Sequence, residues 1–105
     1  MAAKQFAEFP QQKLISEKLV AVFSKSYCPY CRQAKGVIAN LGLPESKVGI
    51  VELDHESEGS DIQAYLADKT GQRTVPNIFI NGKHLGGCSD ILQAEQSGEL
   101  KKLVA

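Results

Sequence analysis

The sequence lacks several features that would place it in a special class of protein. It has no apolar run approaching the roughly 18 residues of a membrane span. It has no excess of either charge, since 12 basic and 12 acidic side chains cancel. We therefore expect neither a membrane nor a nucleic acid as partner. The N-terminus has no long apolar stretch of the kind found in a secretory signal, so secretion is not expected.

Cysteines are also few. Three is an odd number and too small for a disulfide framework, which favours a reducing compartment and a cytoplasmic location. What remains is ordinary: 105 residues, 43% hydrophobic and 23% charged, fit one small soluble domain. Residues 1–9 are interpreted as a frayed N-terminal extension or a short extra turn.

Three short apolar runs are predicted to be strands, because they are continuous, rich in Val, Ile and Phe, and too short for helices. They cover Leu19–Phe23, Val48–Leu53 and Asn77–Ile80. After the third run, Asn81-Gly82 is a strong signal for a type I′ turn, which needs φ > 0 at both central residues. This turn predicts a fourth, antiparallel strand over Lys83–Gly86.

Apolar residues recur at helical spacing around these strands. The predicted helices cover about Pro10–Lys18, Tyr30–Leu41, Ser60–Thr70, Cys88–Gln96 and Ser97–Val104. Ser60 and Gln63 have the spacing of a capping box, and Ser89 or Cys88 is expected to cap the fourth helix. The order α-β-α-β-α-β-β-α-α predicts an α/β protein with one mixed four-stranded sheet and helices on both faces, similar to the thioredoxin-like fold.

Two cysteines lie where the first strand turns into a helix, and Cys28 and Cys31 at this spacing suggest a redox dithiol. Thiol–disulfide exchange needs a reachable thiolate and a second thiol that resolves the mixed disulfide. The Cys28 sulfur should face unpaired N–H groups of the first helical turn, which lower a thiol pKa, and Lys25 would add a positive charge. Cys31, one turn on, should be less exposed and less acidic. We assign Cys28 as nucleophile and Cys31 as resolving thiol.

Other interpretations of these side chains are weaker. A zinc site would need a second pair of ligands, and His55, His84 and Cys88 are isolated from one another, so no metal is expected. An inert buried pair is disfavoured because the Pro-Tyr insert sits at an exposed turn. Cys88 is expected to be a semi-buried packing residue, and both histidines are expected to be solvated surface residues.

The motif Cys28-Pro-Tyr-Cys31, preceded by Tyr27, resembles the active site of the dithiol glutaredoxins. Further matches occur at the spacing of that family, and they are Thr74-Val75-Pro76, Asn81-Gly82 and Gly86-Gly87-Cys88-Ser89-Asp90. The resemblance covers about residues 19–103, and we interpret residues 1–105 as a single glutaredoxin domain. Thioredoxin itself is disfavoured, because its Trp-Cys-Gly-Pro-Cys motif is absent and the chain has no Trp.

The resemblance implies a glutathione-binding groove beside the dithiol. The backbone of Val75 would pair with the cysteine of glutathione in antiparallel β fashion, and Pro76 resembles a proline that is cis in this fold. Ser89 and Asp90 resemble the pair that holds the γ-glutamyl end, where helix N–H groups suit its carboxylate. The implied glutathione contacts are Lys25, Tyr30, Gln63, Arg73, Thr74, Val75, Pro76, Gly87, Ser89 and Asp90.

Plainer roles stay open for several of these residues. Gln63 could simply close the capping box with Ser60, and Arg73 could be a solvated loop charge. Ser89 and Asp90 could form only a helix cap.

The predicted function is that of a glutathione–disulfide oxidoreductase. It would act as a monomer that reduces disulfide-containing and glutathionylated proteins, with glutathione as electron donor. The alternative is a dimer that holds a [2Fe–2S] cluster through the first active-site cysteine and glutathione. Pro29 argues against it, since cluster-binding members more often carry a small residue there. A thioredoxin-like adaptor without turnover is disfavoured by the complete set of thiols and implied glutathione contacts.

Overall fold

The computed structural model of the protein describes residues 3–105, and their side chains from Pro10 onward. The helices and strands are α1 (Ala3–Glu17), β1 (Val20–Ser24), α2 (Pro29–Ala39), β2 (Val48–Glu52), α3 (Gly59–Thr70), β3 (Asn77–Ile80), β4 (Lys83–Gly86), α4 (Cys88–Ser97) and α5 (Glu99–Leu103). Short 3-10 helices over Glu45–Lys47 and Leu53–His55 flank β2. The predicted order of elements is confirmed.

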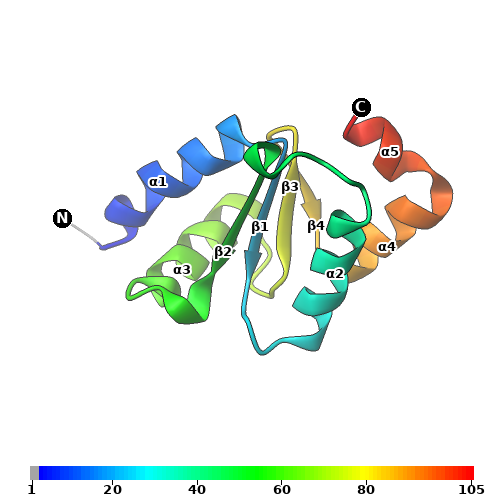
Figure 1. The fold of residues 1–105 in the computed structure, drawn as a ribbon. Coiled ribbons are helices and arrows are strands. Elements are labelled where there is room, and N and C mark those ends of the chain that lie inside the picture. Colours follow the sequence, from blue (N-terminus) through cyan, green and yellow to red (C-terminus); the bar gives the residue numbers. More distant parts are fainter. Residues whose placement is uncertain (1–2) are drawn as a thin grey trace.

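The strands form one mixed sheet in the order β2-β1-β3-β4. β1 pairs with β2 in parallel and with β3 antiparallel, and β3 pairs antiparallel with β4. Helices α1 and α3 lie on one face of the sheet, and α2, α4 and α5 lie on the other (Figure 1). The predicted mixed sheet with helices on both faces is therefore confirmed.

The central strand β1 explains this layering. Successive side chains of a strand point to opposite faces, and all five β1 residues are buried. Val20 and Val22 pack into the cluster under α2 and α4, whereas Ala21 and Phe23 pack into the cluster under α1 and α3. A continuous apolar run is what a strand covered on both faces requires.

The hairpin between β3 and β4 has the predicted turn. Asn81 and Gly82 have φ values of 54° and 79°, in the left-handed region that a type I′ turn needs. A bulge beyond the turn places His84 opposite Phe79 and Gly86 opposite Ile78. β4 thereby ends at Gly86, two residues before α4 begins at Cys88.

Two helix starts differ from the predictions. α1 begins at Ala3, well before the predicted start at Pro10, which occupies an internal position. Tertiary packing overrides this unfavourable proline: α1 lies so close to β2 that a Cβ on Gly49 would meet Leu14 Cδ1 at 2.6 Å. α3 begins at Gly59 without a side-chain cap, so the predicted capping box of Ser60 and Gln63 is wrong.

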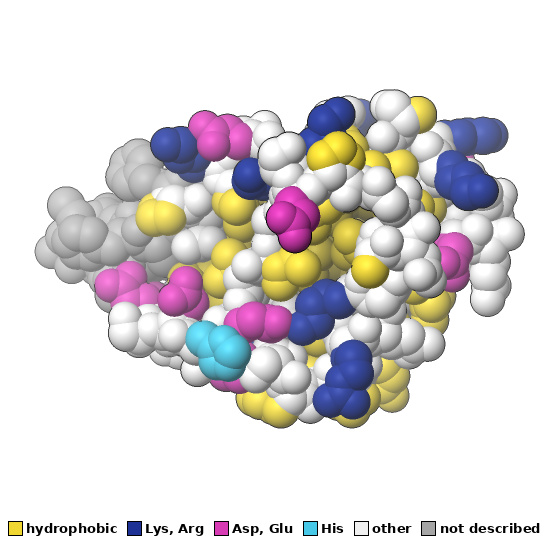
Figure 2. Space-filling model, in the orientation of Figure 1, with side chains coloured by type: hydrophobic (Ala, Val, Ile, Leu, Met, Phe, Trp, Pro, Cys, Tyr) yellow, Lys and Arg dark blue, Asp and Glu magenta, His cyan; other side chains and the backbone are white. Residues whose placement is uncertain are grey.

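The surface reflects the balanced composition. Acidic and basic side chains both occur across the face seen in Figure 2, in keeping with 12 residues of each sign. No helix in the described part of the chain combines the length and apolar character needed to cross a bilayer.

Candidate active site

Cys28 lies at the junction of β1 and α2, directly before the first helical residue, Pro29. It has an extended backbone, with φ −85° and ψ 121°, and its carbonyl accepts the first helical hydrogen bond from the N–H of Arg32 at 3.0 Å. Its own N–H donates to the carbonyl of Lys25 at 3.1 Å, which closes the turn out of β1. Proline suits the first helical position because its missing N–H would have no partner there.

The surroundings of Cys28 favour its thiolate. Desolvation acts to raise the pKa of this thiol, but hydrogen bonds from the N–H of Cys31, the thiol of Cys31 and the N–H of Tyr30 act to lower it, and so does the charge of Lys25. The net result is a pKa below the ordinary value of 9.0. The predicted effects of the helix start and of Lys25 are confirmed.

Cys31 has the opposite surroundings. Its side chain is 0% exposed, and burial together with the neighbouring Cys28 thiolate raises its pKa, although hydrogen bonds from Lys25 and Ser24 oppose the rise. The N–H of Lys25 donates to its sulfur at 3.4 Å. The two thiols thus differ as predicted: one is acidic and partly exposed, the other buried and less acidic.

A polar network that the sequence did not reveal lies behind Cys31. The buried hydroxyl of Ser24, whose side chain also hydrogen-bonds Cys31, donates to the carboxylate of Glu52. The ammonium of Lys35 pairs with the other oxygen of Glu52 at 2.6 Å. Desolvation alone would raise the pKa of Glu52, but Lys35 and Ser24 together lower it. Ser24 and Glu52 are register partners in β1 and β2, so only the strand pairing brings them together.

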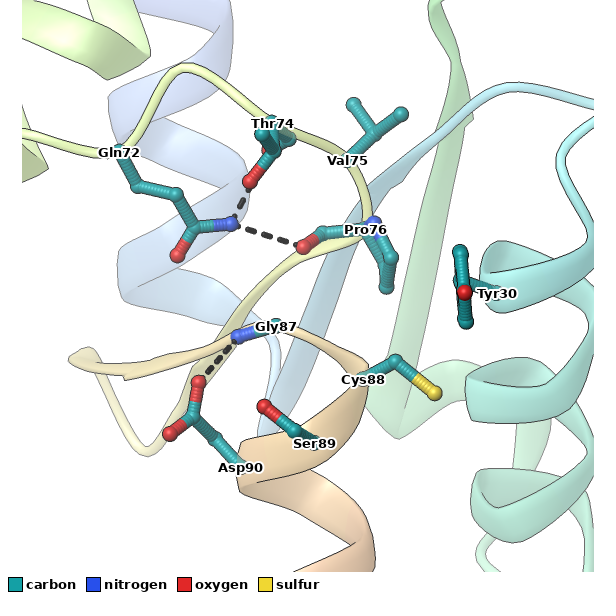
Figure 3. Close-up of a pocket in the computed structure, with 9 residues that line it drawn as sticks. All are labelled: Tyr30, Gln72, Thr74, Val75, Pro76, Gly87, Cys88, Ser89 and Asp90. Carbon is teal, nitrogen blue, oxygen red and sulfur yellow. Dashed lines mark hydrogen bonds between the residues drawn. The ribbon is translucent and has the colours of Figure 1, made fainter.

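A pocket of about 450 Å³ opens next to Tyr30, the residue before Cys31. Figure 3 shows the side chains that line it. Three segments that are far apart in the sequence line it: the first turn of α2, the loop before β3, and the start of α4. Its lining residues are Tyr30, Gln72, Thr74, Val75, Pro76, Gly87, Cys88, Ser89 and Asp90. All except Gln72 and Cys88 belong to the predicted glutathione contacts.

The loop before β3 is held by one side chain. The amide nitrogen of Gln72 donates to the carbonyl of Thr74 at 3.0 Å and to the carbonyl of Pro76 at 2.9 Å (Figure 3). Between them, the Val75–Pro76 peptide bond is cis. Sequence reasoning missed Gln72, because nothing in its spacing shows that its amide folds back onto its own loop.

The start of α4 is capped differently from the prediction. The cap residue is Gly87, not Ser89 or Cys88. Its N–H donates to Asp90 Oδ2 at 2.8 Å, and its carbonyl accepts from the N–H of Ile91 at 3.1 Å. Gly86 has φ 130°, and a Cβ there would collide with the Asp90 carboxylate. Glycine is therefore required at Gly86 by both backbone and space.

Three of the predicted contacts lie outside this pocket. Gln63 and Arg73 line a second pocket of about 240 Å³ along α3, and the side chain of Gln63 donates to the carbonyl of Arg73 at 2.8 Å. Gln63 thus ties the loop to α3 in place of closing a capping box. Lys25 lines neither pocket, but its charge acts on Cys28.

The third thiol and the histidines differ in their contacts. Cys88 is buried, more deeply than the predicted semi-buried position. Its S–H donates to Gln33 Oε1 at 3.6 Å, and burial and the charge of Cys28 raise its pKa. His55 is 66% exposed and lies 3.6 Å from Asp54. His84 is exposed, but it is not simply solvated, because its ring also hydrogen-bonds other side chains. Among the side chains from Pro10 to Ala105, no cluster of three or more metal-ligating groups occurs.

Known proteins share this arrangement. A family model described as glutaredoxin matches residues 20–85. The chain belongs to the glutaredoxin family. It is 52% identical over 94 residues to Glutaredoxin-1 of Rhizophagus irregularis, an alignment that covers 90% of each protein.

Solved glutaredoxins also share its fold. A buckwheat glutaredoxin–glutathione complex superposes with a TM-score of 0.89 at 42% identity, covering 96% of this chain and 89% of that one. A mutated buckwheat glutaredoxin gives 0.90 at 40% identity with the same coverage. The thioredoxin-like fold and the resemblance carried by the Cys28-Cys31 motif are confirmed. This glutaredoxin is a glutathione-dependent thiol oxidoreductase.

Proposed function

We propose that this glutaredoxin reduces protein disulfides and protein–glutathione mixed disulfides, with Cys28 as nucleophile, Cys31 as resolving thiol and glutathione as electron donor. One observation carries the proposal: the thiol with the lowered pKa is partly exposed, and the thiol with the raised pKa is buried behind it. Exchange begins with attack by a thiolate, so this asymmetry supports Cys28 as the sulfur that attacks first.

In the monothiol route, the Cys28 thiolate attacks the glutathione sulfur of a mixed disulfide. A bond forms between Cys28 and the glutathionyl sulfur, the bond between protein and glutathione breaks, and the protein thiolate leaves and takes up a proton. A second glutathione thiolate then attacks the glutathionyl sulfur on Cys28. Oxidised glutathione leaves, and the Cys28 thiolate is restored.

In the dithiol route, Cys28 attacks a protein disulfide and forms a mixed disulfide with one of its sulfurs. Cys31 loses its proton and attacks the Cys28 sulfur, which releases the protein as a dithiol and leaves an intramolecular disulfide. Two glutathione molecules then reduce that disulfide. Burial and the Cys28 charge raise the pKa of Cys31 and favour its protonated form, and the contribution of that charge ends once the Cys28 sulfur is part of a mixed disulfide.

The glutathionyl group would occupy the 450 Å³ pocket beside Tyr30. The main chain of Val75 would pair with its cysteine, while Ser89 and Asp90 would receive the carboxylate and ammonium of its γ-glutamyl end. The predicted contacts with Lys25, Gln63 and Arg73 would place its glycine carboxylate toward the second pocket. The buckwheat complex with glutathione supports this choice of ligand.

The test is a glutathione-coupled assay of the purified protein on a glutathionylated peptide and on a disulfide-bonded protein. Cys28→Ser should abolish turnover of both substrates. Cys31→Ser should keep much of the activity on the glutathionylated peptide and lose the dithiol route. Full activity in the Cys28→Ser variant would show that Cys28 is not the nucleophile. The monomeric state, the cytoplasmic location and the cluster-binding alternative stay predictions, and visible absorbance after anaerobic purification would favour the last.

A further inference from the structure

The histidine of β4 takes part in a hydrogen-bonded chain that ends at the pocket. His84 Nε2 lies 2.9 Å from Asn77 Oδ1 and 3.2 Å from Gln72 Oε1. Asn77 is 1% exposed and begins β3. The imidazole also packs against the ring of Phe79, at a centroid distance of 5.3 Å. The ring is therefore fixed both by packing and by its nitrogen.

The orientation of Gln72 decides which atom carries the proton. Its amide nitrogen faces two carbonyl oxygens, those of Thr74 and Pro76, and only an N–H group can donate to both. Its amide oxygen is therefore the end that faces His84. Because both partners of His84 Nε2 are oxygen acceptors, that nitrogen must carry a hydrogen. The single N–H of His84 Nε2 is thus shared between Asn77 Oδ1 at 2.9 Å and Gln72 Oε1 at 3.2 Å, and Gln72 in turn donates to the loop.

These hydrogen bonds hold the loop on both sides of Val75 but do not involve Val75 itself. Of the three consecutive carbonyls of Thr74, Val75 and Pro76, Gln72 engages the first and the third. Neither the N–H nor the carbonyl of Val75 hydrogen-bonds another main-chain group of residues 3–105. The side chain of Val75 points away from Cys88 and Ser89 (Figure 3). What Val75 offers the pocket is its main chain, a donor and an acceptor suited to an extended peptide backbone.

We propose that Gln72 and His84 are positioning residues for the glutathionyl group: they hold the loop carbonyls on either side of Val75, so that its main chain is ready to pair with a peptide ligand. This inference rests on the proposed function, because it needs a glutathionyl ligand at Val75. The loop after α3 has no regular secondary structure before β3 begins at Asn77. Without the hydrogen bonds from Gln72 and His84, this loop would have to be ordered at each binding event. The lost conformational entropy would then weaken binding.

The experiment compares isosteric variants with matched controls. Gln72→Glu replaces the two N–H donors by oxygen at the same place, and Gln96→Glu makes the same change at an exposed position of α4. His84→Ala removes the donor to Gln72, His84→Gln restores an N–H donor, and His55→Ala removes an exposed imidazole elsewhere. The readouts are KM and kcat for a glutathionylated peptide, the Cys28 pKa from thiolate absorbance, and the unfolding midpoint.

We expect KM for the glutathionylated peptide to rise roughly five- to tenfold in Gln72→Glu and His84→Ala, as for the loss of about one neutral hydrogen bond. The kcat should stay within about twofold of the wild-type value, and the Cys28 pKa should stay within about 0.3 of it. His84→Gln should recover part of the loss, and both controls should behave as wild type.

Wild-type KM in a folded Gln72→Glu protein would overturn the inference. A loss of activity that follows the unfolding midpoint or the Cys28 pKa would overturn it as well, because the pair would then be only structural. If the wild-type protein fails to turn over the glutathionylated peptide at all, the proposed function itself is wrong. The two failures are therefore distinguishable. Should His84→Ala not fold, the Gln72→Glu and His84→Gln variants decide the question.

Discussion

The starts of α2 and α4 lie on either side of the same pocket and use their N–H groups differently. At α2 no side chain caps the helix, and the N–H groups of Tyr30 and Cys31 stabilise the Cys28 thiolate. At α4 the Asp90 carboxylate accepts from the N–H of Gly87. At the start of α2 the Cys28 thiolate thus stands where a capping side chain would be. At the start of α4 a carboxylate binds the N–H of the cap residue.

The difference separates reactivity from recognition. An uncapped helix start with a sulfur beside it lowers a thiol pKa, which is what attack requires. A capped start is fixed in place before any ligand arrives, and Asp90 Oδ2 is used by the protein itself. Recognition at the start of α4 therefore depends on the shape of the site, whereas reactivity at the start of α2 depends on charge. Substitutions at the two helix starts should therefore change different properties of the protein.

Adding one methyl group should damage the α4 start and leave α2 intact. Gly86→Ala forces a Cβ into the Asp90 carboxylate at φ 130°, so we expect a loss of roughly 2–4 kcal/mol in the free energy of unfolding. Gly36→Ala in α2 meets no atom within 4 Å and should stabilise by about 0.5–1 kcal/mol. Urea unfolding measures both. If the two substitutions changed the free energy of unfolding by the same amount, or if Gly86→Ala left it unchanged, the strained geometry at Gly86 would be contradicted.

The two tasks of Asp90 can be separated. Asp90→Ala removes the acceptor for the N–H of Gly87, and we expect a loss of about 1 kcal/mol in stability. Asp90→Asn keeps an oxygen acceptor and should stay within about 0.5 kcal/mol of the wild type. Both variants should raise KM for a glutathionylated peptide if the charge of Asp90 receives an ammonium group.

The matched control is Asp61→Asn, which removes a carboxylate from the first turn of α3. It should leave KM unchanged and alter stability by only a few tenths of a kcal/mol. A wild-type KM in Asp90→Asn would show that Asp90 only caps the helix.

Much of this site was predictable because its signals are local. The Cys28-Cys31 spacing, the strand before it and the helix after it predict an acidic outer thiol and a buried inner one. The Asn81-Gly82 turn even fixes the hairpin register that sets His84 opposite Phe79, on the same face as Asn77 two residues earlier. The hydrogen bond between His84 and Asn77 could thus have been anticipated.

Other contacts were not predictable, because they depend on distant pairings or on backbone folding back on itself. Ser24 meets Glu52 only through the register of a parallel pair. Gln72 reaches its own loop across a cis peptide bond. The spacing of Ser60 and Gln63 matched a capping box, yet the start of α3 one residue earlier gave Gln63 another partner, the carbonyl of Arg73.

The pH dependence of stability should carry opposite signs for the thiols. The folded pKa of Cys28 lies below 9.0, so between that pKa and 9.0 the unfolded chain binds more protons than the native one. Stability from Cys28 therefore rises with pH through this window and is lost as pH falls through the folded pKa. Cys31 and Cys88 have raised values, so their contribution is present below 9.0 and is lost as pH rises above it. Urea unfolding between pH 5 and 10 should lose the rise in Cys28→Ser and keep the fall.

The smallest effect should come from Lys25, whose charge is the last of the causes that lower the Cys28 pKa. In Lys25→Met, the midpoint of Cys28 alkylation by iodoacetamide should move up by a few tenths of a pH unit, because the charge of this half-buried lysine is partly screened by water and salt. Lys47→Met, at the opposite end of β2 from Glu52, is the matched control and should leave the midpoint in place. High salt should narrow the gap between the Lys25 variant and the wild type. A midpoint moved as far as 9.0 by this one substitution would mean that Lys25, and not the N–H groups of the uncapped helix, makes Cys28 acidic.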